Sequence, residues 1–167
     1  MAHKDLREFT AALQSGGDLV VIDEAVDWDQ ELAGIGRLSC EQGGPAFMFN
    51  TVKDYAGWRV LANPVTGWRR YAVALGLPAG TPVRELYRIY AEREQNPIPP
   101  ILVNSSPCKD VIIPESDIDL FDLPVPMVHD GDGGRYLGTW DLVISKDRGT
   151  GWVNWGMYRF MIHDERH

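Results

Sequence analysis

The sequence predicts an α+β fold class, with an N-terminal α/β domain over residues 1–98 and the beginning of a mostly β domain over residues 99–167. Three observations support this prediction. In the first part, helical hydrophobic periods alternate with short runs rich in valine and isoleucine. Prolines then cluster between residues 96 and 134, where no helical period survives. After this segment only strand-like runs remain.

The composition is that of a soluble globular protein. The chain has 167 residues, of which 44% are apolar and 24% charged, and its net charge is −8. The acidic balance argues against binding to nucleic acid or to an anionic membrane surface. No stretch approaches the ~18 apolar residues of a transmembrane helix, and the N-terminus lacks the apolar core of a signal peptide. With only two cysteines, far apart, we expect a cytoplasmic protein.

The first predicted helix covers residues 4–16. Its apolar side chains recur at helical spacing and two glycines follow it: Leu6, Phe9, Ala12, Leu13, Gly16 and Gly17. A strand rich in valine and isoleucine is predicted over residues 18–26. The helical pattern resumes over residues 27–44, with Asp27 or Asp29 as N-cap and a glycine pair at its end.

Two further strands are predicted over residues 45–52 and 55–65, the second ended by Pro64. A helix follows over residues 67–77 and is closed by Gly76.

The clearest helix pattern in the chain covers residues 81–94. Thr81 is a suitable cap and Pro82 suits the first helical position. Four apolar or aromatic residues share one face of this helix: Val83, Leu86, Tyr87 and Tyr90.

The proline-rich segment 96–134 is predicted to be extended chain with short strands. Beyond it, residues 135–147 and 151–164 form two strand-like runs joined by a sequence, "DRGTG", that suits a tight turn. We therefore predict a β-hairpin. Because a lone hairpin is marginal in water, we expect this chain to be the front part of a longer protein with more strands.

Alternation along the second run places potential ligand groups on both faces. Asn154 offers an amide oxygen, Arg159 a planar fork that suits a carboxylate or phosphate, and Gly156 room for a flat ligand. One face is predicted to carry Trp152, Asn154, Gly156 and Tyr158, and the other Val153, Trp155, Met157 and Arg159. The alternative is an aromatic hairpin packed on a core, with Arg159 in an ion pair, and composition alone favours it.

The segment "NWGMYR" at 154–159, preceded by Trp152, resembles the signature W-x-N-W-x-[IM]-x-R of the UbiD family of decarboxylases. Other segments resemble the family too. These are "SPCKDVI" at 106–112, "DIDLFDLPVP" at 117–126, "HDGDGGRYLGT" at 129–139, and the N-terminal residues 5–35. The resemblance therefore extends along nearly the whole chain, and the motifs are specific in combination.

The resemblance implies an enzyme that uses prenylated FMN, held in a split β-barrel domain, to decarboxylate aromatic or α,β-unsaturated carboxylic acids reversibly. Asn154 would be a ligand of Mn²⁺, and the carbonyl of Trp155 would help to bind K⁺. Arg159 would be the active-site arginine that positions the substrate carboxylate. The remaining cofactor contacts would come from Thr139, Gly156, Met157 and Tyr158, the last three mainly through backbone groups.

The family's other metal ligands, a histidine and a glutamate, have no counterpart in this sequence. The two glutamates that act with the arginine are also absent, and His163 and His167 are too close to Asn154 to replace the histidine. We therefore expect a truncated split-barrel domain and an inactive 167-residue chain. The full-length protein would form a homo-oligomer and would depend on a flavin prenyltransferase for its cofactor.

Two alternatives to this function remain open from the sequence. The chain could be a non-catalytic fragment or subunit that binds a partner chain. It could also belong to an ordinary flavin-dependent reductase, because split β-barrels bind FMN as well.

Four other groups of residues receive plainer interpretations. Residues 129–132 suit a turn better than a metal site, and Cys108 suits a small buried hydrophobe better than a reactive thiol. Residues 68–70 suit the polar edge of a helix better than a site for an anionic ligand or coenzyme A. The acidic residues between 115 and 122 suit a solvated loop better than an acid–base pair.

Overall fold

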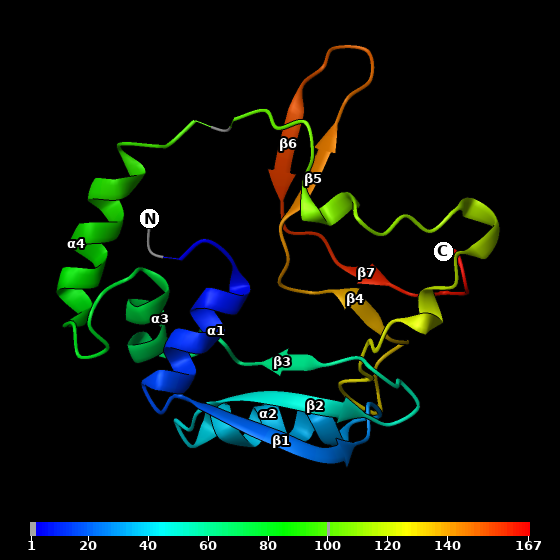
Figure 1. Cartoon of the computed structure of the whole chain (residues 1–167), viewed down its shortest axis with the longest axis horizontal. Coiled ribbons are helices and arrows are strands. Elements are labelled where there is room, and N and C mark those ends of the chain that lie inside the picture. Colours follow the sequence, from blue (N-terminus) through cyan, green and yellow to red (C-terminus); the bar gives the residue numbers. More distant parts are fainter. Residues whose placement is uncertain (1–2, 100) are drawn as a thin grey trace. The chain divides into compact units, whose positions relative to one another are not determined.

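The computed structural model describes residues 3–99 and 101–167 (Figure 1). The chain divides into two compact units, each assembled from three separate stretches. Unit 1 consists of Met1–Ile22, Gly36–Met48 and Leu61–Asp117, and unit 2 consists of Asp23–Ile35, Phe49–Val60 and Ile118–His167. The predicted boundary at residues 98 and 99 stays a prediction.

A three-stranded sheet in the order β1-β2-β3 forms from the predicted strands. It consists of β1 (Leu19–Val26), β2 (Ala46–Val52) and β3 (Val60–Ala62), with helix α2 (Glu31–Glu41) between β1 and β2. The amide of Ala46 donates to the carbonyl of Asp18, and the amide of Lys53 donates to that of Val26. Both strands therefore start together and end together, so they run in the same direction with α2 as the crossover (Figure 1).

Helix α1 (Leu6–Ser15) confirms the first predicted helix, and Asp5 caps it by accepting a hydrogen bond from the amide of Glu8 at 2.9 Å. Its apolar face builds the core of unit 1. Phe9, Leu13, Leu19 and Ala46 form the buried cluster there, with Met48, Leu61, Val73 and Ala74 packed against it.

Helices α3 (Trp68–Ala74) and α4 (Val83–Glu94) confirm the two later helices, but the predicted start of α4 is wrong. Pro82 occupies the N-cap position and Thr81 caps nothing, because its hydroxyl donates to the carbonyl of Pro78 at 2.6 Å. Of the predicted apolar face of α4, only Leu86 is fully buried. No helix in the described ranges is both long and apolar enough to cross a bilayer.

Residues 96–99 and 101–134 have none of the predicted short strands, apart from a single isolated bridge between Met127 and Asp29. Three 3₁₀ turns occur instead: η1 (Pro107–Lys109), η2 (Glu115–Asp117) and η3 (Leu120–Asp122). Prolines remove backbone donors from any ladder, while Asp119 caps η3 by accepting from the amide of Phe121 at 2.8 Å. Local turns therefore replace strand pairing here.

The predicted hairpin is confirmed, but each of its two runs forms two short strands rather than one. In unit 2, β5 (Val143–Lys146) pairs antiparallel with β6 (Val153–Gly156), and β4 (Tyr136–Gly138) pairs antiparallel with β7 (Phe160–Met161). Figure 1 shows β5 and β6 side by side, joined by the loop around residues 147–152.

Asp147 organises the turn of this hairpin. Its carboxylate accepts from the backbone amide and the hydroxyl of Thr150, at 2.6 and 2.7 Å, and Gly151 supplies the positive φ of 74°. The hydrogen bond from the Thr150 amide is the main reason why the pKa of Asp147 lies below its ordinary value.

Candidate functional site

The aromatic side chains of the β5–β6 hairpin lie on the surface of this chain. Trp152 and Trp155 are each 64% exposed, and Tyr158 is 52% exposed. Arg159 forms no ion pair with the residues that the structure describes. The interpretation of an aromatic hairpin packed on a core, with Arg159 in an ion pair, is therefore wrong for this chain.

Asn154 and Tyr158 meet, as the sequence predicts, although Tyr158 lies beyond the end of strand β6 and its alternation does not extend that far. The side-chain amide nitrogen of Asn154 donates to the phenol oxygen of Tyr158 at 3.1 Å. Asn154 pairs with Ser145 of β5 in the antiparallel ladder, and this register fixes the position of Asn154 along the hairpin. The strand ends at Gly156, and the ring of Tyr158 folds back toward the strand that precedes it.

Gly156 makes this return possible. A Cβ atom at position 156 would lie 2.7 Å from Cε2 of Tyr158, closer than carbon atoms approach each other. The predicted role of Gly156, to allow a close approach, therefore has a counterpart in the structure, and the approaching group is the Tyr158 ring.

Arg159 lies beyond the strand, so the alternation of β6 does not orient it. Its guanidinium carbon is 5.5 Å from the ring centroid of Tyr136, on β4. The exposed residues Thr139, Trp155 and Met157 complete the predicted set, with Thr139 directly after β4. The hairpin thus joins Asn154, Gly156 and Tyr158 in one cluster, and Arg159 with Tyr136 in another.

Asp141 is a polar residue at this site that the sequence analysis missed. Among the described residues, its Oδ1 is a buried side-chain oxygen that has no hydrogen-bond partner. A Cβ atom on Gly138 would lie 2.6 Å from this oxygen, so the carboxylate sits directly against β4 beside Thr139. A buried oxygen without a partner suits a site where a ligand or ion supplies the missing interaction.

Arg135 is the second residue that the sequence analysis missed. Its guanidinium lies 4.3 Å from the ring of Trp28 and 5.4 Å from that of Tyr55. It donates to the carbonyls of Val125 and Leu123, at 2.6 and 3.0 Å, and to the hydroxyl of Tyr55 at 2.6 Å. The only signal in the sequence was its place at the start of a strand-like run, which does not reveal these distant contacts.

The backbone of Arg135 also helps to place the hairpin. Its carbonyl accepts from the amide of Ile162 at 2.8 Å, which extends the pairing of β4 with β7. Arg135 therefore ties the base of β4, and with it Tyr136, to three other segments of unit 2.

A complete metal site is not present among the residues that the structure describes, because no group of three or more histidine, cysteine, aspartate or glutamate side chains gathers there. His129 and Asp132 lie 3.3 Å apart within their turn, as the plainer interpretation of residues 129–132 predicts. Asn154 fits a hard cation as one ligand, because its nitrogen contacts Tyr158 and its oxygen is available. The described residues thus fit one side of a metal site.

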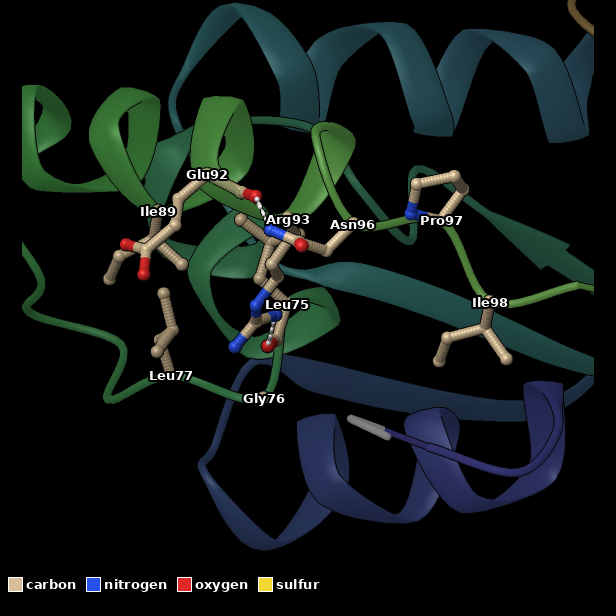
Figure 2. A pocket seen from close by; sticks show the side chains of 9 residues that line it. All are labelled: Leu75, Gly76, Leu77, Ile89, Glu92, Arg93, Asn96, Pro97 and Ile98. Atoms are coloured by element: carbon tan, nitrogen blue, oxygen red, sulfur yellow. Dashed lines mark hydrogen bonds between the residues drawn. The ribbon is translucent and has the colours of Figure 1, made fainter.

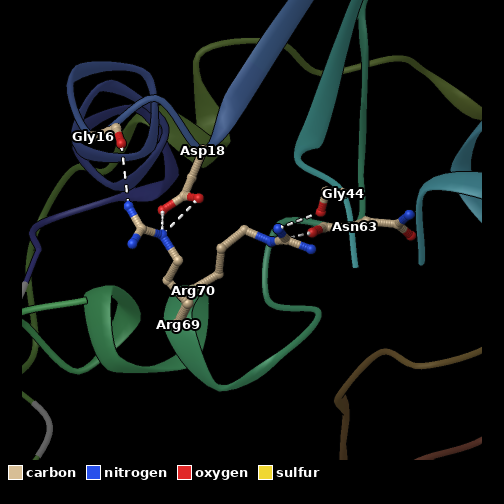
Figure 3. Close-up of polar contacts among 6 residues, drawn as sticks. All are labelled: Gly16, Asp18, Gly44, Asn63, Arg69 and Arg70. Atoms are coloured by element: carbon tan, nitrogen blue, oxygen red, sulfur yellow. Dashed lines mark hydrogen bonds and ion pairs between the residues drawn. The ribbon is translucent and has the colours of Figure 1, made fainter. Parts of the chain in front are cut away.

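Arg69 and Arg70 are both occupied within unit 1, so they do not form the anion site considered above (Figure 3). The Arg69 guanidinium donates to both carboxylate oxygens of Asp18, at 2.7 and 2.8 Å. Arg70 is buried and donates to the carbonyls of Gly44 and Asn63, at 2.8 and 3.1 Å, and burial lowers its pKa. The plainer interpretation was also wrong for Arg70, which is not at a polar edge.

Cys108 is exposed rather than buried, and its thiol lies 3.3 Å from the hydroxyl of Ser106. The prediction of a small buried hydrophobe at this position is wrong, because Cys108 lies in η1 of the proline-rich segment, none of whose three residues is buried.

Unit 1 contains a cavity of about 840 Å³, which holds none of the predicted site residues (Figure 2). It is lined by Leu75–Leu77, by the C-terminal half of α4 and by residues 96–98. Figure 2 shows Arg93 pointing to the carbonyl of Leu75, to which it donates at 2.6 Å.

Two family models match this chain. Residues 10–90 match the 3-octaprenyl-4-hydroxybenzoate carboxy-lyase N-terminal domain, and residues 101–167 match the 3-octaprenyl-4-hydroxybenzoate carboxy-lyase Rift-related domain. Together they extend along most of the sequence.

Among curated proteins, the chain is 36% identical to a phenolic acid decarboxylase of Bacillus subtilis, over 97% of this chain and 36% of that protein. Among solved structures, it resembles vanillic acid decarboxylase of Sedimentibacter hydroxybenzoicus in its open form, with a TM-score of 0.88 and 32% identity over 98% of this chain and 35% of that one. An evolved dimeric form of the UbiD-class enzyme HmfF from Pelotomaculum thermopropionicum, in complex with prFMN, matches with a TM-score of 0.82 and 30% identity over 96% and 36% of the two chains. The chain thus spans about a third of the length of its relatives.

Proposed function

Because the chain belongs to the UbiD family, we propose that it is the N-terminal part of a decarboxylase that uses prenylated FMN and acts reversibly on aromatic or α,β-unsaturated carboxylic acids. The observation that supports this most directly is the match of both family models in sequence, with the segment 154–159 inside the second. The HmfF structure supports the cofactor, since that enzyme was solved in complex with prFMN.

The bound flavin would supply an electron sink for the electron pair that stays on an sp² carbon when its carboxylate is lost as CO₂. The residues of this chain would bind the substrate and the cofactor and orient them relative to each other. Arg159 would hold the substrate carboxylate through its planar fork of donors. Tyr136, 5.5 Å from that guanidinium, would support the arginine from its other face.

Asn154 would bind a Mn²⁺ ion through its amide oxygen, and the carbonyl of Trp155 would bind K⁺. Thr139 and the backbone of Gly156, Met157 and Tyr158 would line the flavin. The exposure of this hairpin supports the proposal, because the side chains stand free to receive a cofactor and the rest of a longer chain.

The relatives suggest the class of substrate. Their names give phenolic acids and vanillic acid, which are hydroxylated aromatic acids. We propose the same class for this protein, with a homo-oligomeric assembly, a cytoplasmic location and a flavin prenyltransferase as the supplier of the cofactor.

The test is Arg159→Ala in the full-length protein, produced with a flavin prenyltransferase. We expect kcat for a phenolic acid to fall by at least about 10²–10³-fold, because the carboxylate loses its cation, while the flavin absorbance of the purified protein is unchanged. Asn154→Ala should instead lower flavin and Mn²⁺ occupancy, measured by absorbance and by elemental analysis.

Arg148→Ala is the matched control, because Arg148 is an exposed arginine in the loop of the same hairpin. Arg148→Ala should change neither kcat nor the flavin and Mn²⁺ occupancy. Full activity of the Arg159→Ala variant would remove Arg159 from the mechanism, and unchanged Mn²⁺ occupancy in Asn154→Ala would remove Asn154 from the metal site.

A further inference from the structure

The hydrogen bond between Asn154 and Tyr158 has a direction that matters for metal binding. The amide nitrogen of Asn154 is the donor and the phenol oxygen of Tyr158 is the acceptor, at 3.1 Å. Asn154 is half-buried on β6 and Tyr158 is 52% exposed two residues beyond the strand. Water can replace such a contact at little cost to folding, so stability alone does not account for it.

A carboxamide presents two different ends. Its oxygen is an acceptor that a hard cation takes as a ligand, whereas its NH₂ group carries two donors and repels a cation. Without a partner, rotation about the last side-chain bond exchanges the two ends. A phenol hydroxyl can accept from the nitrogen or donate to the oxygen; in this structure it accepts from the nitrogen, which leaves the oxygen available on the opposite side for a cation.

Tyr158 reaches this position because residue 156 is a glycine. The space that a Cβ atom would need at position 156 is filled by the Tyr158 ring, with Cε2 at 2.7 Å and both Cζ and the phenol oxygen at 3.1 Å. The two residues therefore act together: Gly156 admits the ring, and the ring presents its hydroxyl to Asn154.

We propose that Tyr158 is a positioning residue that orients the Asn154 amide so that its oxygen, and not its nitrogen, faces the metal ion. This inference rests on the proposed function, in which Asn154 is a metal ligand. It adds a role for the Tyr158 side chain, which the resemblance to the UbiD family gives only a backbone contact. Partners that orient a metal ligand in this way typically change metal affinity by about 10- to 100-fold when they are removed.

The experiment measures Mn²⁺ affinity of the full-length protein with saturating FMN, from the EPR signal of free Mn²⁺, so it needs no turnover. Tyr158→Phe removes the hydroxyl and keeps the ring. We expect Mn²⁺ binding about tenfold weaker, the lower end of the usual range, because water replaces part of the contact. Tyr87→Phe is the control, since Tyr87 is also an exposed tyrosine, on α4, and this change should not affect Mn²⁺ affinity.

A second pair of variants, made in the Asn154→Asp protein, separates an effect on the orientation of the residue 154 side chain from a general effect on the metal site. In Asn154→Asp both terminal atoms are oxygens, so no rotation can present the wrong end to the ion. Adding Tyr158→Phe to Asn154→Asp should therefore change Mn²⁺ affinity by less than about twofold, if orientation is what Tyr158 provides. Gly156→Ala, which displaces the ring without altering its hydroxyl, should weaken binding in the Asn154 background as Tyr158→Phe does.

The outcomes are distinct. Unchanged affinity in Tyr158→Phe, or an equal loss in the Asn154→Asp background, would overturn the positioning role. Asn154→Ala identifies a failure of the proposed function instead: if that variant binds Mn²⁺ as tightly as the wild type, Asn154 is not a ligand. Loss in Asn154→Ala with no loss in Tyr158→Phe would overturn the inference and leave the proposed function standing.

Discussion

Arg135 is a half-buried cation whose recorded partners are all uncharged. In residues 3–99 and 101–167 it forms no ion pair; backbone carbonyls, one hydroxyl and aromatic faces surround it instead. Arginine tolerates this because its charge is spread over a weakly hydrated plane that stacks on aromatic rings. Removing Arg135 destabilises the fold because the oxygens that accept its hydrogen bonds would be left without a donor.

We predict that Arg135→Met, which keeps much of the side-chain volume, lowers the free energy of unfolding by about 2–4 kcal/mol, since three hydrogen bonds and the stacking on Trp28 are lost. Urea denaturation followed by tryptophan fluorescence measures this. Arg7→Met is the control at a highly exposed position and should cost less than about 0.5 kcal/mol. A loss below about 1 kcal/mol in Arg135→Met would mean that the contacts of Arg135 with these rings and acceptors contribute little to stability.

The sequence predicted some of these residues and not others, for a physical reason. Asn154, Gly156 and Tyr158 lie four residues apart or less, so a local pattern could group them, although Tyr158 reaches Asn154 by folding back after β6 ends at Gly156 and not by strand alternation. The contacts of Arg135 reach Tyr55, 80 positions earlier, and no local pattern encodes such a distance. The orientation of Arg159 also escaped prediction, because β6 ends before it.

At the scale of elements, apolar residues at helical spacing and runs rich in valine and isoleucine predicted the helices and strands of the first 98 residues, although their burial is sparse: Leu86 alone is buried in α4, and β3 is half-buried throughout. The features that hydrophobic periodicity did not predict are set by local polar contacts. The Thr81 hydroxyl found the carbonyl of Pro78 rather than a helix amide, and η3 formed around Asp119 where strands were expected. Such side-chain contacts compete with regular structure over two or three residues, which is too short for a period to reveal.

The end of β1 and the residue after β2 are joined by an ion pair, in which Lys53 Nζ lies 2.6 Å from Oδ2 of Asp27. The hydrogen bond from Lys53 is the largest cause that holds the pKa of Asp27 below its ordinary value, followed by the bond from the Asp29 amide. A depressed carboxyl pKa in the folded state stabilises the protein above the unfolded-state pKa, and this contribution is lost as the pH falls through the folded value.

We therefore predict that the stability difference between wild type and Lys53→Met is present at pH 6 and shrinks as the pH falls below about 4, the ordinary carboxyl pKa, because the unfolded chain then takes up a proton at Asp27 before the folded protein does. Melting temperatures between pH 6 and pH 3 measure it. Arg59→Met, at an exposed arginine that forms no ion pair with the described residues, is the control, and its difference from wild type should stay flat over the same range. A difference for Lys53→Met that is constant with pH would show that Asp27 gains nothing from this lysine.

At the scale of the whole chain, the segment from residue 98 to residue 113 exposes apolar side chains that a stable soluble surface rarely shows in such a row. Most are more than half exposed: Ile98, Ile101, Leu102, Val103, Val111, Ile112 and Ile113. Nothing in this part of the sequence predicted the exposure, because burial depends on what lies against a segment, and the chain spans about a third of its relatives.

We predict that the 167-residue chain binds the dye ANS strongly and that the full-length protein binds much less per molecule, because the longer chain covers this apolar row. ANS fluorescence at equal molar concentration measures it. A triple variant of the short chain, Ile101→Ser, Leu102→Ser and Val103→Ser, should reduce the signal. Equal dye binding by the short and full-length proteins would mean that the row stays uncovered in both.

The rings around Arg135, those of Trp28, Tyr55 and Phe121, are synthesised before the arginine that contacts them. Trp28 leaves the ribosome about a hundred residues before the arginine that it stacks on, which at bacterial or eukaryotic translation rates is a wait of roughly 5–20 s. During that interval the guanidinium that contacts Trp28 and Tyr55 has not yet been synthesised, so neither ring can have this contact. Chaperones that act at the ribosome exit would find these aromatics available, and a slow codon run before residue 135 would lengthen this interval.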